Sequence, residues 1–410
     1  MAECLRVILL LLSVALGLPR FASARTLYQS ADGALSVRLT GYLKTLALGL
    51  DTSLAETHDT AEDFTRTRLM LEGDIGPRFR WTMHYEHFGV INPAGEATAG
   101  LFAGGRSTRT QRPSLLPLDW TVRKAGSLLW RHELDRLSVR VAFPSADIVI
   151  GRQAISWGVG RLWTPSDLFV AFSPVEIDRE FKAGVDAVSM KWPLGSFSQL
   201  EAVYAVFDDD FRSHSAGVRV QTTVGDFDLG MMAGKFFHDF VTGPFFDGEV
   251  KGVGVRGEFT LTHNTGHVNR EQRTFIRGVS SVDYRFANGL YAFLEYYFNG
   301  VGEEDPEDYP RLFGSERLSR GEIFNFGRHY LGTILEYEPH PLVKANLLGL
   351  WNFLDQSFLM GPFLIVSLSD EADLRTGAYF PVGTGLVGPR VKSEFGLYPQ
   401  VYYLELRLYF

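Results

Sequence analysis

Apolar and polar residues alternate strictly over many short stretches of this chain. The last stretch, Gln400 to Phe410, carries apolar or aromatic side chains at every second position: Tyr402, Leu404, Leu406, Leu408 and Phe410. Similar stretches begin at Leu35, Leu69, Phe79, Leu137 and Val253. A period of two is typical of a β-strand with one apolar face. The sequence therefore predicts an all-β chain.

The alternation fits two kinds of fold, and the N-terminus favours one of them. In a soluble sandwich the apolar face is the core, whereas in a membrane barrel it faces lipid and the charged face lines the lumen. Met1 to Ala24 has the features of a secretory signal peptide: Arg6, then apolar residues 7–18, then Ala22-Ser23-Ala24. We expect cleavage after Ala24, which leaves residues 25–410 as one exported barrel domain.

Composition excludes several classes of function. Cys4, the single cysteine, lies in the expected signal peptide, so disulfides, thiolate catalysis and covalent haem attachment are not expected in residues 25–410. The formal net charge of −8 disfavours nucleic acid as a partner. Aromatic residues make up 13% of the chain, which suggests girdles at the two membrane interfaces.

The two ends of the chain together resemble those of Gram-negative outer-membrane porins. The signal peptide, the alternating pattern and the terminal strand carry this resemblance. It implies an integral outer-membrane protein, exported through the secretory pathway, surrounded by lipid and assembled by the barrel-insertion machinery. That machinery would read Leu408 and Phe410, although Glu405 stands where the family usually has glycine. The implied fold is a transmembrane antiparallel up-and-down β-barrel with short periplasmic turns and long outer loops.

Counting turns from each end predicts about 18 strands. The predicted short turns are Gly76-Pro77, 144–146, 194–196, Gly225-Asp226, 287–289, 338–341 and 369–372, and the predicted outer loops are 51–63, 91–120, 156–182, 208–213 and 300–327. The two counts agree only if Phe240 to Asp247 is a strand between turns at His238-Asp239 and Gly248-Glu249. Sixteen strands is the alternative, because segments 121–134 and 382–398 are ambiguous.

Residues 151–182 form the segment richest in candidate function. Alternation stops after Ile148 and Ile150, and glycines and prolines exclude a long strand or helix. Large aromatic residues interleave with charges of both signs, so they need a surface to pack against. We interpret this loop as folding into the barrel and narrowing the pore; a compact outer cap is the alternative. The candidate constriction residues are Arg152, Trp157, Arg161, Trp163, Asp167, Glu176, Asp178 and Arg179.

Charges opposite the apolar face of the strands are the candidate lumen residues. They are Arg38, Arg68, Arg80, Glu86, Arg140, Arg256, Glu258, Arg277 and Arg375. Rings of one sign would indicate ion selectivity, so this mixture predicts a weakly selective, water-filled pathway. The alternative is a network of ion pairs that fills a narrow lumen.

A glycine motif and several histidine spacings give only weak indications of a cofactor or metal site. Gly252, Gly254 and Gly257 match a dinucleotide fingerprint but lie within an alternating stretch with no helix after it. The histidine spacings lack a third metal ligand nearby, so we expect no metal, no cofactor and no enzymatic activity. The predicted function is a channel for passive diffusion of small solutes or ions. The alternative is a sheath or conduit for a periplasmic or surface partner, such as a redox protein or an exported polymer.

Overall fold

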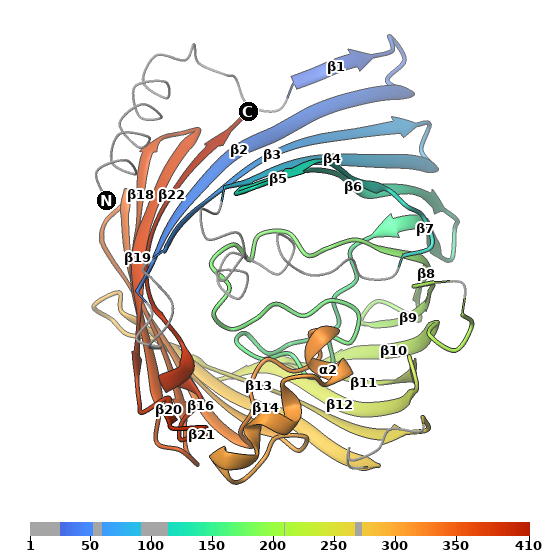
Figure 1. Cartoon of the computed structure of the whole chain (residues 1–410). Helices are drawn as coiled ribbons and strands as arrows, with labels where there is room; N and C mark the ends of the chain where they lie inside the picture. The colour runs from blue at the N-terminus through green and yellow to red at the C-terminus, as the bar shows by residue number, and fades with distance from the viewer. Residues whose placement is uncertain (1–24, 52–59, 92–113, 209, 267–272) are drawn as a thin grey trace.

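The computed structural model describes residues 25–51, 60–91, 114–208, 210–266 and 273–410. Twenty of the described strands form one antiparallel sheet that closes on itself as a barrel (Figure 1). Eighteen strands make the wall: β2 (Leu35–Asp51), β3 (Thr60–Ile75), β4 (Phe79–Ile91), β6 (Leu128–Ala142), β7 (Asp147–Gln153), β8 (Val185–Pro193), β9 (Ser198–Ala205), β10 (Ser215–Val224), β11 (Phe227–Phe236), β12 (Asp239–Val250), β13 (Val253–Asn264), β14 (Thr274–Arg285), β15 (Tyr291–Asn299), β16 (His329–His340), β17 (Val343–Asn352), β18 (Phe358–Ser369), β19 (Ala372–Val382) and β22 (Gln400–Tyr409).

The predicted all-β barrel is confirmed, and 18 rather than 16 is the strand count. The predicted strand at Phe240 to Asp247 lies within β12, but both predicted turns are displaced: the outer turn is Phe237-His238 rather than His238-Asp239, and the inner turn lies beyond the predicted place near Gly248-Glu249. β12 continues to Val250, which pairs with Val253, so the inner turn is Lys251-Gly252. Both turn residues have positive φ, 51° and 84°. Such two-residue turns suit the twist of a hairpin.

The two ambiguous segments add no strand to the wall. Residues 119–134 form a hairpin of β5 (Asp119–Ala125) with the upper part of β6, while β7 pairs with the lower part of the same edge of β6. Residues 383–399 form an outer segment with a small hairpin, β20 (Leu386–Val387) and β21 (Arg390–Val391), and a short helix, η3 (Phe395–Leu397). Segment 300–328 carries η2 (Pro306–Leu312) and α2 (Glu316–Ser319).

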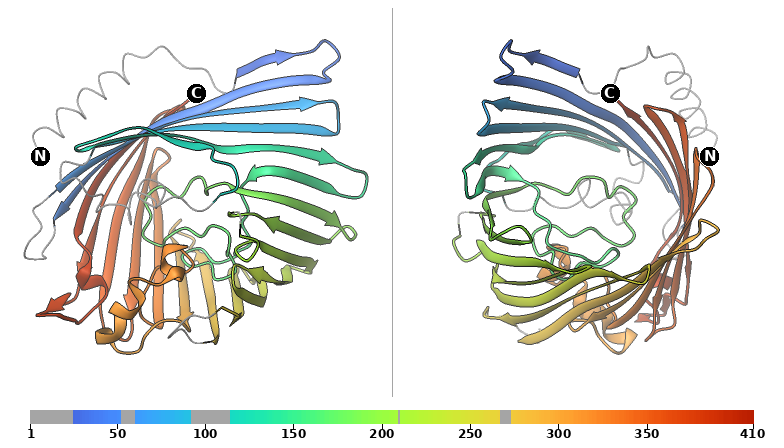
Figure 2. Two further views of the ribbon diagram at one scale, coloured as in Figure 1. Left: turned by 45° about the vertical axis from the view of Figure 1, so that its right-hand side comes forward. Right: turned by 180° about the vertical axis from the view of Figure 1, so that it is seen from behind.

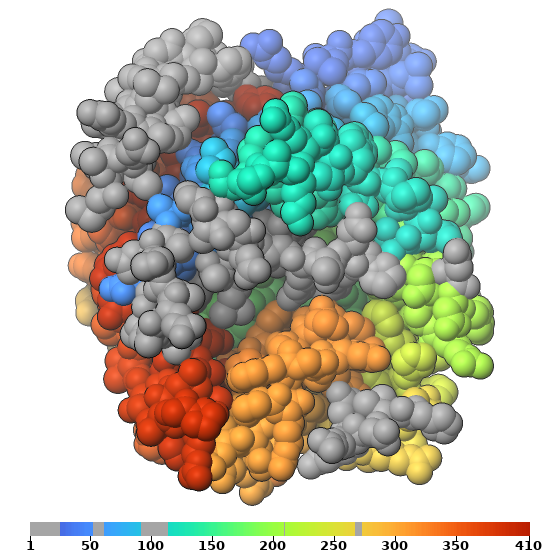
Figure 3. Space-filling model, in the orientation of Figure 1, coloured from blue at the N-terminus to red at the C-terminus, as the bar shows by residue number. Residues whose placement is uncertain are grey.

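Short turns and long loops lie at opposite ends of the barrel, because successive wall strands are antiparallel. In Figure 3, which faces the end with the long loops, the β5–β6 hairpin (teal) and segment 300–328 (orange) gather around the mouth. The outer face of the wall is apolar: it carries residues such as Leu69, Val139, Leu229 and Leu294, which are each 36–44% exposed. An apolar outer belt of this kind is what lipid requires of a barrel.

The barrel closes where β22 pairs with β2. Tyr409 lies opposite Tyr42, and Phe410 exchanges backbone hydrogen bonds with Gly41 at 2.8 and 3.0 Å. Below this point β1 (Arg25–Gln29) takes over the same edge of β2. The phenyl ring of Phe410 covers Gly41, so a Cβ there would lie 2.5 Å from the ring and 2.5 Å from the Arg68 carbonyl oxygen.

We therefore expect Gly41→Ala to impair barrel assembly, because the added methyl group meets both a ring and rigid backbone. Gly49→Ala is the matched control on the same strand, since the atom nearest to its Cβ is 4.0 Å away. The measurement is the fraction of protein that shows heat-modifiable migration after expression. A strained core contact costs about 1–3 kcal/mol, so the Gly41 variant should show clearly less folded protein. Equal fractions for the two variants would contradict this account of the seam.

Candidate pore constriction

Residues 154–184, which we call the inner loop, connect β7 to β8 and run inside the barrel. Figure 1 and both views of Figure 2 place this segment, drawn in green, within the ring of strands. Its two ends are close together, because Gln153 and Val185 are direct partners in the sheet. The loop therefore leaves the wall, crosses the lumen and returns to the neighbouring position.

A buried carboxylate on the opposite wall holds the first turn of the inner loop. Glu295 of β15 accepts hydrogen bonds from three successive backbone N–H groups, those of Arg161, Leu162 and Trp163, at 2.9–3.0 Å. The Glu295 side chain is fully buried. Buried polar groups need partners, and here the carboxylate and three loop amides satisfy one another.

A second glutamate, Glu258 of β13, holds the residues on either side of this turn. It accepts from the Val159 amide at 2.7 Å and from the Ser166 hydroxyl at 2.6 Å. The chain folds tightly enough here to need glycine at position 160, where a Cβ would lie 2.0 Å from the Trp163 carbonyl oxygen. Glycine permits this close approach of backbone to backbone, so the loop sequence and the wall carboxylates fix one shape.

The far part of the inner loop is bound by the closing seam. Asp178 accepts from Lys44 of β2 at 3.2 Å and from Arg66 of β3 at 2.8 Å, and Glu180 is paired with Lys44 as well. Burial alone would raise the pKa of Asp178, but Arg66 and Lys44 hold it well below its usual range. On β19, Arg375 donates to the carbonyl of Ile177. The loop is thus anchored on several sides of the barrel.

Apolar packing fills the space between the inner loop and the outer half of the wall. Trp163 stacks on Tyr297 with ring centroids 5.1 Å apart, and its indole N–H donates to Asn325 at 2.8 Å. Trp157 packs edge-on against Phe169 and Phe236. Each tryptophan belongs to a buried cluster that joins loop and wall residues. This half of the lumen is a packed core rather than an open polar tube.

The eight predicted constriction residues take different positions. Trp157, Trp163, Asp167 and Asp178 are buried, and Asp167 is paired with Lys182. Arg152 lies at the end of β7, where its guanidinium binds Asp186 at 2.8 and 2.9 Å, so it belongs to the wall. Solvent reaches Arg161, Glu176 and Arg179.

The accessible charges of the inner loop have both signs, with Arg161, Arg179 and the mostly buried Lys182 beside Glu176 and Glu180. Arg161 donates to the Tyr291 hydroxyl at 2.5 Å, and its guanidinium lies 5.5 Å from the Phe293 ring. Arg179 and Lys182 each lie 5.7 Å from the ring of Phe172. This charged surface is the part of the loop that a solute in the lumen can meet.

The nine predicted lumen charges divide into two groups. Arg38, Arg80 and Arg140 are half-exposed near the short turns, where Asp74 pairs with the first two and Asp147 with the third. The other six are buried or nearly so and contact the wall, the inner loop or segment 300–328: Arg68, Glu86, Arg256, Glu258, Arg277 and Arg375.

One important residue escaped the sequence pattern. Asp135 sits at a β-bulge in β6, between the residues that pair with His84 and Tyr85. A bulge re-aims one side chain, and here it turns a fully buried carboxylate toward Arg68 at 2.7 Å and the Gly184 amide at 3.0 Å. Asp135 therefore holds the return end of the inner loop. The break in alternation at residues 134–136 is the signal that would have located it.

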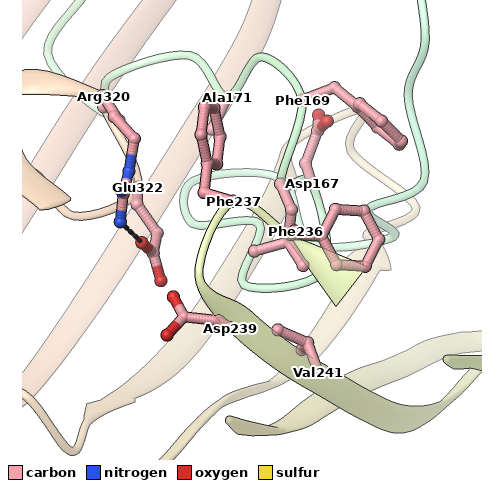
Figure 4. Close-up of a pocket in the computed structure, with 11 residues that line it drawn as sticks. Asp167, Phe169, Ala171, Phe236, Phe237, Asp239, Val241, Arg320 and Glu322 are labelled. Carbon is pink, nitrogen blue, oxygen red and sulfur yellow. Dashed lines mark hydrogen bonds and ion pairs between the residues drawn. The ribbon is translucent and has the colours of Figure 1, made fainter. Parts of the chain in front are cut away.

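Segment 300–328 is tied to the wall beside the inner loop. Arg317, fully buried, binds Asp239 at 2.7 Å and Glu322 at 2.8 Å. Burial would raise the pKa of Glu322, but Arg277, Arg317 and Arg320 together lower it to about 2. Figure 4 shows Arg320 bound to Glu322 beside Asp239.

A small cavity of about 10 Å³ lies between segment 300–328 and the inner loop (Figure 4). Asp167 and Glu322 are among its lining residues, and one oxygen of Asp167 has no hydrogen-bond partner among the described residues. A polar cavity of this size has room for one water molecule. The two segments therefore fit closely enough to leave space for a single bridging water.

A third network joins the outer segments to one another. Glu394, fully buried, accepts from Asn325 at 2.7 Å, from Asn352 at 3.2 Å and from the Tyr330 hydroxyl. Burial raises the pKa of Glu394 to about 7. These contacts connect the mouth segments 300–328 and 383–399 to the top of β16 and β17.

The raised pKa predicts that this network weakens as pH rises. A folded pKa above the unfolded value means that the contribution to stability is complete below about pH 4.5 and lost through pH 7. Complete ionisation of Glu394 would lower the free energy of unfolding by at most about 3 kcal/mol. Amide hydrogen exchange in residues 383–399, corrected for intrinsic rates, should be faster at pH 8 than at pH 5. Glu394→Gln, which stays neutral, should remove most of this difference; an equal difference in the variant would contradict the assignment.

Among the residues that the structure describes, no group of three or more histidine, cysteine or acidic side chains is placed to hold a metal ion. Within the same residues, no helix has the length and apolar character needed to cross a membrane.

Comparison with known proteins identifies the architecture. No protein-family model matches the sequence, and no curated protein sequence does. Several solved structures match the fold. OccAB4 of Acinetobacter baumannii has a TM-score of 0.57 at 8% identity, OpdK of Pseudomonas aeruginosa with vanillate 0.53 at 10%, and a BenF-like porin of Pseudomonas fluorescens 0.53 at 9%. Each alignment covers 91% of this chain and 98% of the other. This chain has the fold of the outer-membrane porins, an antiparallel β-barrel of 18 strands.

Proposed function

We propose that this protein is a channel for passive diffusion of small solutes across the outer membrane, narrowed by the inner loop. The observation that carries the proposal is a loop fixed across the lumen from several sides: by Glu258 and Glu295, by Lys44 and Arg66, and by Arg375. A loop anchored in this way gives a passage of constant width. The similarity to porins supports the same function.

The solutes that we favour are small organic anions. Arg161 and Arg179 lie on the accessible face of the inner loop beside aromatic rings, and Lys182, which pairs with Asp167, lies beside Phe172. Cations over aromatic faces suit planar, negatively charged ligands. One porin of similar fold, OpdK, was solved with vanillate, an aromatic carboxylate. We extend that chemistry to this chain as a proposal.

Recording from the purified protein in a planar lipid bilayer tests the proposal. We expect stable open steps without any added partner, and a reversal potential in a KCl gradient that favours chloride. Persistent silence would contradict a diffusion channel and favour the sheath for a partner chain. A partner inside the barrel would have to displace the packed inner loop, so silence would also predict a different loop position.

A further inference from the structure

A hollow on the lipid-facing surface interrupts the otherwise bulky outer belt. Its floor carries three alanines, Ala202, Ala216 and Ala233, on β9, β10 and β11. Its sides include Val188 and Val218, which are 44% and 47% exposed. The cavity volume is about 520 Å³. We call this feature the outer-face hollow.

The inner loop is the reason that the wall is thin here. Gly217 and Gly234 face the lumen directly behind the alanines. A Cβ at Gly217 would lie 2.9 Å from Trp157, and one at Gly234 would lie 2.9 Å from Phe236. The lumen face of the wall therefore carries glycines, which contact the buried aromatic cluster. The outer face carries alanines. The hollow itself follows from the three outward alanines.

A cation stands above the hollow, at its outer end. Lys235 is the direct sheet partner of Ala216, one residue from the end of β11 that carries the outer turn. Its ammonium donates to the backbone carbonyls of Arg212 and His214, each at 2.8 Å. The described residues thus supply two acceptors for three N–H groups. These bonds hold the charge at the rim, where lipid headgroups lie.

We propose that the outer-face hollow binds one acyl chain of an anionic, phosphate-bearing glycolipid of the outer leaflet, with the phosphate on Lys235. An apolar void that faces hydrocarbon loses dispersion contacts unless a chain fills it. A lysine ammonium at the rim pairs with phosphate as a point charge. The site lies outside the lumen, so this proposal stands apart from the proposed function.

Native mass spectrometry of the detergent-solubilised barrel with added lipid A tests this proposal. We expect a one-to-one adduct that is tighter than the adduct with phosphatidylethanolamine. Ala216→Leu/Ala233→Leu fills the hollow and should weaken lipid A binding severalfold, because the displaced chain loses its dispersion contacts with the wall. Ala345→Leu is the control, because Ala345 also faces outward, opposite the exposed Leu364 on the far wall. Lys235→Gln should abolish the preference for lipid A while chain binding remains.

Two results would overturn the proposal. If Ala216→Leu/Ala233→Leu retains as much lipid A as Ala345→Leu, the hollow does not hold the chain. If the unmodified barrel binds anionic lipid A and zwitterionic phosphatidylethanolamine equally, the net negative charge of the headgroup does not contribute. Bilayer conductance of the same variants should stay unchanged, which separates this test from that of the proposed channel.

Discussion

Deleting residues 156–182 should raise single-channel conductance severalfold. The inner loop occupies the lumen together with two buried aromatic clusters, and its removal leaves water in that space. A short glycine-serine linker can replace it, because Gln153 and Val185 are direct sheet partners. The wall keeps its interstrand hydrogen bonds, so the barrel should still fold.

Heat-modifiable migration must first show that the deletion variant is folded. Conductance is then compared with that of the intact chain in the same bilayer and salt. An unchanged conductance in a folded variant would mean that the loop does not limit the passage. The ion preference should weaken at the same time, because Arg161, Arg179 and Lys182 all lie within the deleted segment.

The wall could be predicted from sequence because its signal is local. A strand with one face toward lipid has a hydrophobic period of two, and the alternating pattern begins again after each turn. The inner loop was recognisable as an interruption rich in aromatics. Its direction is not encoded locally, because an inward loop and an outer cap have the same local composition.

The contacts that orient the loop are long-range, and the sequence does not reveal them locally. Glu295 lies more than 130 positions from the amides it binds, and Asp135 acts only because a bulge turns it inward. The lumen also departs from the expected polar lining. On β2 the inward positions of the outer half are Leu46, Leu48 and Leu50, which join a buried cluster. The apolar run at residues 46–50 was the available signal, since both faces of the strand become apolar there.

Replacing Glu295 by alanine should loosen the inner loop without deleting it. Three buried N–H groups, those of Arg161, Leu162 and Trp163, would lose their acceptor. Each unsatisfied group costs about 1–3 kcal/mol, which is enough to shift this turn from its place. We expect higher and noisier conductance, with brief closures that the unmodified channel lacks.

Glu336→Ala is the matched control for Glu295→Ala. Glu336 also faces the lumen, on the neighbouring strand β16, but its carboxylate is partly exposed and pairs with Arg285 at 3.5 Å. Removing it takes away the same charge without freeing any loop amide. Glu295→Gln, which keeps one acceptor oxygen, should fall between the two. If Glu295→Ala and Glu336→Ala change conductance and noise equally, then charge rather than loop anchoring is responsible, and the rigid constriction would have to be abandoned.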